Sequence, residues 1–189
     1  AEQRKDWANK FFWIIPIIIV VAIVLIALFF SYAARENKRA SIRPGKKSLK
    51  EELLYICHLV VHPFDGFWDL KHEYRGSLRS GLVILFVTVI AFYYQSIGTG
   101  YIFNSSGKTG TIFSAALSVI VPLMLWVIAN WGLTTLFDGE GSFKDVFVAS
   151  TYAIAPLPVL IIVSTILSNF LVTSEGSIIT ICTGLAFGW

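Results

Sequence analysis

Long apolar runs alternate with short polar segments along most of the chain, and this pattern is its clearest feature. The first run, Phe11 to Phe30, contains no charged residue. Because an α-helix rises about 1.5 Å per residue, the run would be about 30 Å long, which matches the hydrocarbon core of a bilayer. The pattern therefore predicts an all-α protein, a polytopic bundle of transmembrane helices.

Four further apolar runs bring the prediction to about five spans in this chain. They cover about residues 81–97, 112–137, 146–172 and 177–189. The last run has about 13 residues, fewer than the roughly 20 that a membrane-spanning helix needs. Because the sequence also begins without Met, we expect the native protein to continue at both ends and the fifth span to be truncated here.

Polar segments divide the chain into three predicted regions. Residues 1–34 form an extracytoplasmic flank and an N-terminal anchor, residues 35–47 a basic linker, and residues 48–189 a membrane domain. The apolar run of the anchor is longer than the core of about 7 to 15 residues found in signal peptides, and a basic cluster follows it. We therefore interpret it as a retained anchor.

A short amphipathic helix is predicted over residues 48–62, at the start of the membrane domain. Ser48 and Glu51 have the spacing of a capping box, and Pro63 ends the helix. A broad apolar arc covers one face. The opposite, polar face holds Glu51, Tyr55, His58 and His62. At about 21 Å the helix is too short to cross a bilayer, so we expect it to lie on the membrane surface or against the spans.

Basic residues gather on one side of the first predicted span. Of the fifteen Lys and Arg residues, ten lie between Arg35 and Arg79, while three precede the span. The positive-inside rule therefore predicts that residues 35–80 are cytoplasmic and that the N-terminus is outside. The basic residues flank a membrane span and do not cover a soluble domain, so we expect the lipid bilayer, and no nucleic acid, as their partner.

The predicted spans contain no Asp, Glu, His, Lys or Arg. Ion-coupled transporters and intramembrane enzymes usually need such groups at membrane depth, so the sequence favours a protein that is not an enzyme and has no cofactor. His58 and His62 are four residues apart on one predicted helical face, a spacing that can bind zinc. No third ligand or HExxH pattern accompanies them, so they are weak candidates and we expect no metal site.

Other residues of the spans are candidates for binding or packing. Pro156 and Pro158 interrupt the fourth span, where the freed backbone carbonyls either line a substrate site or belong to a packed kink. Asn130 is a polar candidate in the third span. Gly184 and Gly188 have the GxxxG spacing that lets membrane helices pack closely, either within the bundle or with a partner.

The predicted loop at residues 138–145 looks superficially like a glycine-rich phosphate cradle. It lacks the Walker spacing, and its acidic residues would repel a phosphate group. We expect its glycines to reverse the chain, and Ser142 with Asp145 to cap the fourth span.

The segment from Phe64 to Ser80 is rich in aromatic and charged residues. Aromatic and Arg side chains dominate the binding energy of protein interfaces, so we consider this segment a candidate surface for binding other membrane subunits. The candidate contacts are Phe64, Phe67, Trp68, Asp69, Lys71, Tyr74 and Arg75. The same residues would also suit an aromatic and basic belt at the lipid headgroups, and this alternative stays open.

Three segments, in this order, resemble the Yip domain family, named for Ypt/Rab-interacting proteins. They are Asp65 to Arg75 followed by Gly76 and Ser77, then Gly139 to Phe147, and then Ala155-Pro156-Leu157-Pro158. The resemblance covers roughly Leu49 to the C-terminus and implies a bundle of about five membrane helices with a cytoplasmic N-terminal segment. Eukaryotic members are linked to Rab GTPases and Golgi vesicle traffic.

The preceding anchor and the short basic linker are more similar to bacterial members of that family. A bacterial plasma membrane is therefore the expected location, and a Rab-type GTPase is an expected partner only if the protein is eukaryotic. The expected function is that of a non-enzymatic subunit or scaffold of a membrane complex, such as an accessory subunit of a transport system. The alternative is a transporter, channel or lipid-handling protein for an uncharged or lipid-like substrate.

Overall fold

The computed structural model describes residues 2–42, 47–100, 103–104, 110–137, 139, 141–170 and 176–188, with side chains except at 2–16, 18–19, 41–42 and 186–187. These residues form helices and connecting turns, and no strand occurs among them. The predicted all-α fold class is therefore confirmed. The chain divides into two units, Ala1–Val61 and His62–Trp189.

The first unit contains one very long helix and one short helix, α1 (Glu2–Ile42) and α2 (Leu49–Val61). α1 has 41 residues. At about 1.5 Å per residue it is about 60 Å long, twice the thickness of a bilayer's hydrocarbon core. It contains the charge-free run, and its stretch Val20–Ala40 is long and apolar enough to cross a membrane.

The end of α1 extends into the stretch that the sequence predicted as a linker. Residues Arg35 to Ile42 are helical, since neither Gly nor Pro occurs among them to interrupt the helix. Glu36 pairs with Arg39 across one turn at 3.0 Å, which favours the helix slightly. Pro44 and Gly45, at the centre of the predicted linker, lie outside the described residues.

α2 packs beside α1 within the first unit. The Asn37 side-chain amide donates a hydrogen bond of 3.1 Å to the carbonyl of Leu54. At the start of α2, the N–H of Ser48 donates to the Glu51 carboxylate at 2.9 Å, one of the two bonds of the predicted capping box. Tyr55, which the sequence placed on the polar face opposite the apolar arc, is buried. The buried residues of α2 are Glu52, Tyr55 and Leu59, so its buried face differs from the apolar arc of the sequence pattern.

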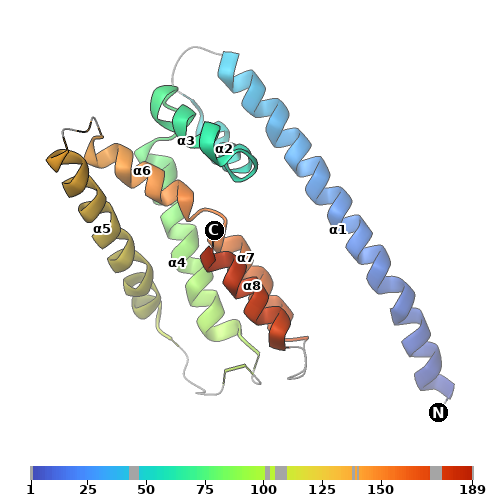
Figure 1. Cartoon of the computed structure of the whole chain (residues 1–189). Coiled ribbons are helices and arrows are strands. Elements are labelled where there is room, and N and C mark those ends of the chain that lie inside the picture. Colours follow the sequence, from blue (N-terminus) through green and yellow to red (C-terminus); the bar gives the residue numbers. More distant parts are fainter. Residues whose placement is uncertain are drawn as a thin grey trace. The chain divides into compact units, whose positions relative to one another are not determined.

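The second unit is a helical bundle arranged around α4. In the described residues it contains α3 (Pro63–His72), α4 (Leu78–Gly98), α5 (Ile112–Leu136), α6 (Phe143–Ala153), α7 (Leu157–Ser168) and α8 (Gly176–Gly188). α4 packs against α5, α6 and α7, while α8 packs on α7 and α3 contacts α6 (Figure 1). The helical stretches long and apolar enough to span a membrane in this unit are Leu78–Gly98, Ile112–Leu136 and Phe143–Ser168. With the stretch in α1, they identify a multi-pass membrane protein.

The fourth predicted span is broken, as its prolines indicated. Pro156 and Pro158 have no N–H, so the carbonyls of Tyr152 and Ile154 lose their usual helical donors. The N–H of Ala155 donates to Tyr152 at 3.2 Å instead, and that of Leu157 donates to Ile154 at 3.0 Å. These local bonds satisfy the backbone of the break, which supports a packed kink.

α3 occupies residues for which the sequence pattern predicted no helix. Pro63 stands in its first turn, where the missing N–H costs little and the fixed φ angle suits a helix. The N–H of Gly66 donates to the carbonyl of His62 at 2.9 Å and closes this first turn. Pro63 therefore ends α2, as predicted, and also begins α3.

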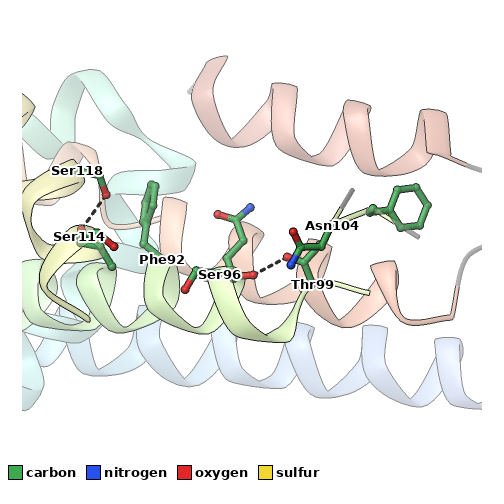
Figure 2. A pocket seen from close by; sticks show the side chains of 9 residues that line it. Phe92, Ser96, Thr99, Asn104, Ser114 and Ser118 are labelled. Carbon is green, nitrogen blue, oxygen red and sulfur yellow. Dashed lines mark hydrogen bonds between the residues drawn. The ribbon is translucent and has the colours of Figure 1, made fainter. Parts of the chain in front are cut away.

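Two cavities lie beside α5. The first has a volume of about 570 Å³ and lies between the Gly98 end of α4 and the Ile112 end of α5 (Figure 2). The second has a volume of about 560 Å³ and lies between α5 and the break that joins α6 to α7. The sequence pattern indicated neither of them.

Candidate functional site

The Ser77 end of α4 is fixed tightly to α6. Ser77 caps α4, and its hydroxyl accepts a hydrogen bond from the backbone N–H of Ser80. Ser80 is buried, and the Tyr152 hydroxyl donates to its Oγ at 2.9 Å. A Cβ atom on Gly81 would lie 2.8 Å from Oγ1 of Thr151, so only glycine allows this approach of the two helices. This packing gives α3, which precedes Ser77, a rigid base.

The turn between α3 and α4 is also closely packed. A Cβ atom on Gly76 would lie 2.8 Å from Leu70 and 2.9 Å from Val148, so a larger residue at this position would displace one of these side chains. Tyr74 adopts a left-handed backbone conformation with φ 50°, and its side chain is 80% exposed. A non-glycine residue in this conformation is strained, so the surrounding packing holds Tyr74 in place.

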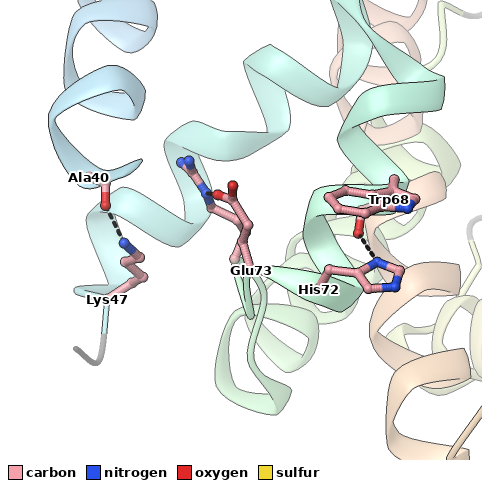
Figure 3. A network of polar contacts seen from close by, with 6 residues as sticks. Ala40, Lys47, Trp68, His72 and Glu73 are labelled. Atoms are coloured by element: carbon pink, nitrogen blue, oxygen red, sulfur yellow. Dashed lines mark hydrogen bonds and ion pairs between the residues drawn. The ribbon is translucent and has the colours of Figure 1, made fainter. Parts of the chain in front are cut away.

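The exposed aromatic residues of α3 face away from the bundle core. Phe64 is 91% exposed and Trp68 is 59% exposed. The indole of Trp68 stacks on the His72 ring with centroids 4.2 Å apart, and Nδ1 of His72 lies 2.9 Å from the Trp68 carbonyl (Figure 3). The stack restrains Trp68 in an exposed position.

A cavity of about 230 Å³ lies between α3 and the start of α6. Phe67, Lys71 and Tyr74 line one side of it, and Gly141, Lys144 and Asp145 line the other. Ser142 and Asp145 form the capping box that the sequence predicted, which orients the first turn of α6. We use the name α3–α6 surface for the exposed aromatic residues and this cavity rim: Phe64, Phe67, Trp68, Lys71, Tyr74 and Lys144.

The predicted contact residues therefore divide into two groups. Five of them, all on or just after α3, belong to the α3–α6 surface: Phe64, Phe67, Trp68, Lys71 and Tyr74. Asp69 is half-buried and does not line the cavity. Arg75 is 7% exposed and its Nε donates to Glu73 at 2.8 Å, so it stabilises the turn. Lys144 was not predicted, because only folding brings it beside α3.

Residues 58–189 match the family described as Yip1 domain, and they make up more than half of the chain. The chain belongs to the Yip1 domain family. No curated protein and no solved structure gives a significant match. The Yip1 domain includes the whole second unit, so the α3–α6 surface and the cavities beside α5 are all features of this domain.

The polar and proline candidates of the spans, Asn130, Pro156 and Pro158, do not line the three cavities described in the Yip1 domain. The Asn130 amide donates to the Trp126 carbonyl of its own helix at 2.9 Å. Pro158 is buried, and neither Pro156 nor Pro158 lines one of the three cavities described. The residues beside the break that do reach a cavity are Ala153, Ile154 and Leu157.

Gly184 and Gly188 lie on α8 with open space around them. A Cβ atom on either would meet no described atom within 4 Å. The pair therefore makes no close helix contact within the described residues. Contact with a partner helix remains the prediction for this GxxxG motif.

The histidine pair does not have the helical spacing on which the weak metal prediction relied. α2 ends at Val61, and His62 has φ −129° and ψ 74°, outside the helical region. His58 packs near the Tyr55 ring, with centroids 5.5 Å apart. Among the described residues, no group of three or more His, Cys, Asp or Glu side chains comes together.

One ionisable group of α2 has a shifted pKa. Burial raises the pKa of the Cys57 thiol, and a backbone hydrogen bond lowers it by a smaller amount. Burial disfavours the thiolate because a charge is poorly solvated there. Cys57 is therefore a protonated, weakly reactive thiol at neutral pH, which is typical of a structural cysteine.

Proposed function

We propose that this Yip1-domain protein is a non-enzymatic integral subunit or scaffold of a membrane complex, such as an accessory subunit of a transport system. It binds other membrane subunits through the α3–α6 surface. The observation that carries the proposal is the exposure of Phe64, Trp68 and Tyr74 on a rigidly packed base. Preorganised aromatic residues lose little conformational entropy when they bind, and they dominate interface energies.

The chemistry of the α3–α6 surface favours a partner segment that is apolar and acidic. The cavity of about 230 Å³ could accept one apolar side chain between Phe67 and Tyr74. Lys71 and Lys144 stand at its rim and are exposed, and neither forms an ion pair with another described residue. An acidic group on the partner would complement these two charges and would also speed the encounter.

The proposed location is a bacterial plasma membrane, with residues 35–80 in the cytoplasm and the N-terminus outside. The distribution of basic residues supports this orientation. The α3–α6 surface would then be offered to cytoplasmic segments of other subunits. A Rab-type GTPase belongs among the partners only if the source is a eukaryote.

The test is purification of the tagged full-length protein from its native membranes in mild detergent. We expect a stoichiometric partner, and we expect Phe64→Ala and Trp68→Ala to reduce its recovery by tenfold or more, since truncating a hot-spot residue costs about 2 kcal/mol or more. Phe170→Ala is the matched control. Phe170 is 79% exposed but lies beyond α7, away from the α3–α6 surface.

Two results would contradict the proposal. One is wild-type protein that purifies without any stoichiometric partner. The other is a partner that is retained by Phe64→Ala and Trp68→Ala as well as by Phe170→Ala. The second result, together with weaker association of the isolated α3 region with lipid vesicles after the same substitutions, would favour the headgroup-belt alternative.

A further inference from the structure

The two larger cavities of the Yip1 domain join into one groove along α5. Both are lined by Phe92 and Ser118, so they meet at these two residues. Phe92 lies six residues before the end of α4, and Ser118 lies six residues after the start of α5. At about 1.5 Å per residue, both are about 9 Å from the helix ends. The first cavity therefore occupies the shallow part of the groove, and the second extends toward the middle of the bilayer.

The shallow section is lined by uncharged polar side chains. They are Gln95, Ser96, Thr99, Asn104, Ser114 and Ser118. Each of the hydroxyl groups donates its proton to a backbone carbonyl of its own segment, as Ser96 does to Tyr93 at 2.7 Å and Ser114 to Thr111 at 2.7 Å. Thr99 and Ser118 donate in the same way to Gln95 and Ala115. With their protons donated in this way, these oxygens offer acceptor lone pairs to a ligand; Figure 2 shows the labelled side chains around the cavity.

One further acceptor lies where the two sections meet. Pro122 has no N–H, so the carbonyl of Ser118 lacks the donor that an α-helix normally provides four residues later. Gln95 and Asn104 supply carboxamide groups, and neither side chain makes a hydrogen bond to another described residue. Among its described residues the shallow section is thus rich in acceptors, and the two carboxamides are the donors that they supply.

The deeper section is apolar and opens on the side of the bundle. Its apolar lining includes Val119, Leu123, Trp126, Ile154 and Leu157. The Trp126 side chain is exposed, so the section can be reached from the surrounding bilayer. Ser150 is its other polar residue besides Ser118, and none of the described residues that line the two sections has an ionisable side chain.

We propose that this groove binds one molecule of an uncharged, single-chain amphiphile with a hydroxyl-bearing headgroup, such as a monoacylglycerol. The alkyl chain lies in the deeper section, and the headgroup hydroxyls donate to the acceptors of the shallow section. Each section has a volume within the range of about 300 to 1,000 Å³ that is typical of ligand sites. This is a binding site of the membrane domain and does not depend on the partner surface at α3.

The lining discriminates between this occupant and two others. An anionic phospholipid would bring phosphate oxygens, which need donors or positive charges, and none of the described residues that line the groove is Lys, Arg or His. A transmembrane helix of another subunit has its backbone N–H groups already bonded internally, so it could not satisfy the hydroxyl and carbonyl acceptors. A hydroxyl-bearing headgroup supplies the missing donors.

The test uses the full chain extracted with a styrene–maleic acid polymer, because alkyl glycoside detergents belong to the proposed ligand class, and transferred to phosphatidylcholine nanodiscs. The probe is a monoacylglycerol with a photoreactive group in its alkyl chain. We expect adducts on the lining of the deeper section, at residues 119–126 and 153–157. Unlabelled monoacylglycerol should compete about tenfold better than lysophosphatidic acid of equal chain length, the equivalent of one or two hydrogen bonds.

Two variants and one control make the result decisive. Ser118→Leu fills the junction and should reduce labelling about tenfold, while Gln95→Leu removes the carboxamide oxygen, an acceptor for a headgroup hydroxyl, and should weaken the headgroup preference about fivefold. Ser31→Leu is the matched control, because Ser31 is exposed on α1 and lies outside the groove. Thermal unfolding in the same nanodiscs identifies any variant that is misfolded. If Ser118→Leu is misfolded, Gln95→Leu alone tests the proposal.

Three outcomes would overturn the proposal. Labelling spread evenly over the exposed faces of α4 and α5 would mean ordinary boundary lipid. Equal competition by lysophosphatidic acid would exclude recognition of the hydroxyl headgroup. Capture of a helix from another protein at residues 119–126 would identify the groove as a subunit interface.

Discussion

The two ends of α4 carry similar small and polar residues but use them in different ways. At the Ser77 end, Ser80 forms a hydrogen bond with Tyr152, and Gly81 packs closely against Thr151. The polar side chains there are therefore engaged in contacts within the protein. At the Gly98 end, Gln95 and Ser96 line a cavity beside α5. The same residue types therefore join two helices where they face a complementary helix. Where the neighbouring helix is further away, they line a cavity.

The Gly98 end is not loose on all sides. The N–H of Gly100 donates to the Ser168 hydroxyl at 2.9 Å, and the Asn169 amide donates to the Gly98 carbonyl at 2.8 Å. These bonds hold α4 to the end of α7, while the side toward α5 is hollow. A rigid wall opposite a cavity is the arrangement that a preorganised site requires.

The largest expected effect is the loss of the aromatic ring that closes the Ser77 end. Tyr152→Ala should lower the free energy of unfolding by about 3 to 5 kcal/mol, because it removes a fully buried ring and leaves a cavity. Tyr32→Ala is the matched control, since Tyr32 is exposed on α1. Equilibrium unfolding in detergent micelles measures both, and equal losses in the two variants would show that the Ser77 end is not the tighter one.

A smaller effect is expected from the contact between α4 and α7 at the other end. A Cβ atom on Gly100 would lie 2.3 Å from the Ser168 carbonyl oxygen, so Gly100→Ala should cost about 1 to 3 kcal/mol. Gly184→Ala provides the comparison, because its added Cβ meets no described atom and should cause no loss. Thermal unfolding of the two variants in one detergent gives the difference in stability between them. A tolerated Gly100→Ala would mean that α4 and α7 can move apart at the Gly98 end.

A double-mutant cycle measures the hydrogen bond between Tyr152 on α6 and Ser80 on α4. Tyr152→Phe and Ser80→Ala each remove one partner of the bond at 2.9 Å. We expect a coupling energy of about 0.5 to 1.5 kcal/mol from the unfolding free energies of the two single variants and the double variant. Purely additive losses would show that the two hydroxyls act independently.

The smallest expected effect on stability is at the hollow side. Gln95→Leu should change the unfolding free energy by less than about 0.5 kcal/mol, because its amide makes no hydrogen bond to another described residue. The measurement is the same unfolding titration. A loss comparable to that of Tyr152→Phe would mean that Gln95 belongs to the structural framework and not to a binding site.

The sequence predicts the spans well because a bilayer imposes length and apolarity on them. α5 begins at the predicted residue and ends one residue early, and α4 extends the predicted range by three residues at its start and one at its end. The proline break and the Ser142 cap are local effects of the backbone and were also predictable. α3 was missed because its mixture of aromatic and charged residues has no clear helical period and begins with a proline.

The candidate sites could be predicted only in part. The aromatic contacts near α3 are neighbours in the sequence, so their clustering was visible. The Tyr152–Ser80 bond joins residues 72 positions apart, and Lys144 lies about 70 or more residues from the rest of the α3–α6 surface. Only the packing of helices brings these residues together. The groove beside α5 depends on the distance between neighbouring helices. The hydrophobic period of a single segment carries no information about that distance.

The unbroken course of α1 has a geometric consequence for its two ends. Each residue of an α-helix turns the chain by about 100° and advances it by about 1.5 Å. Inserting one residue between Glu2 and Ile42 would therefore rotate one end relative to the other by more than a quarter turn. An insertion of four residues would change the azimuth by only about 40° while lengthening the rod by about 6 Å. α1 therefore fixes both the distance between its two ends and their relative orientation about the helix axis.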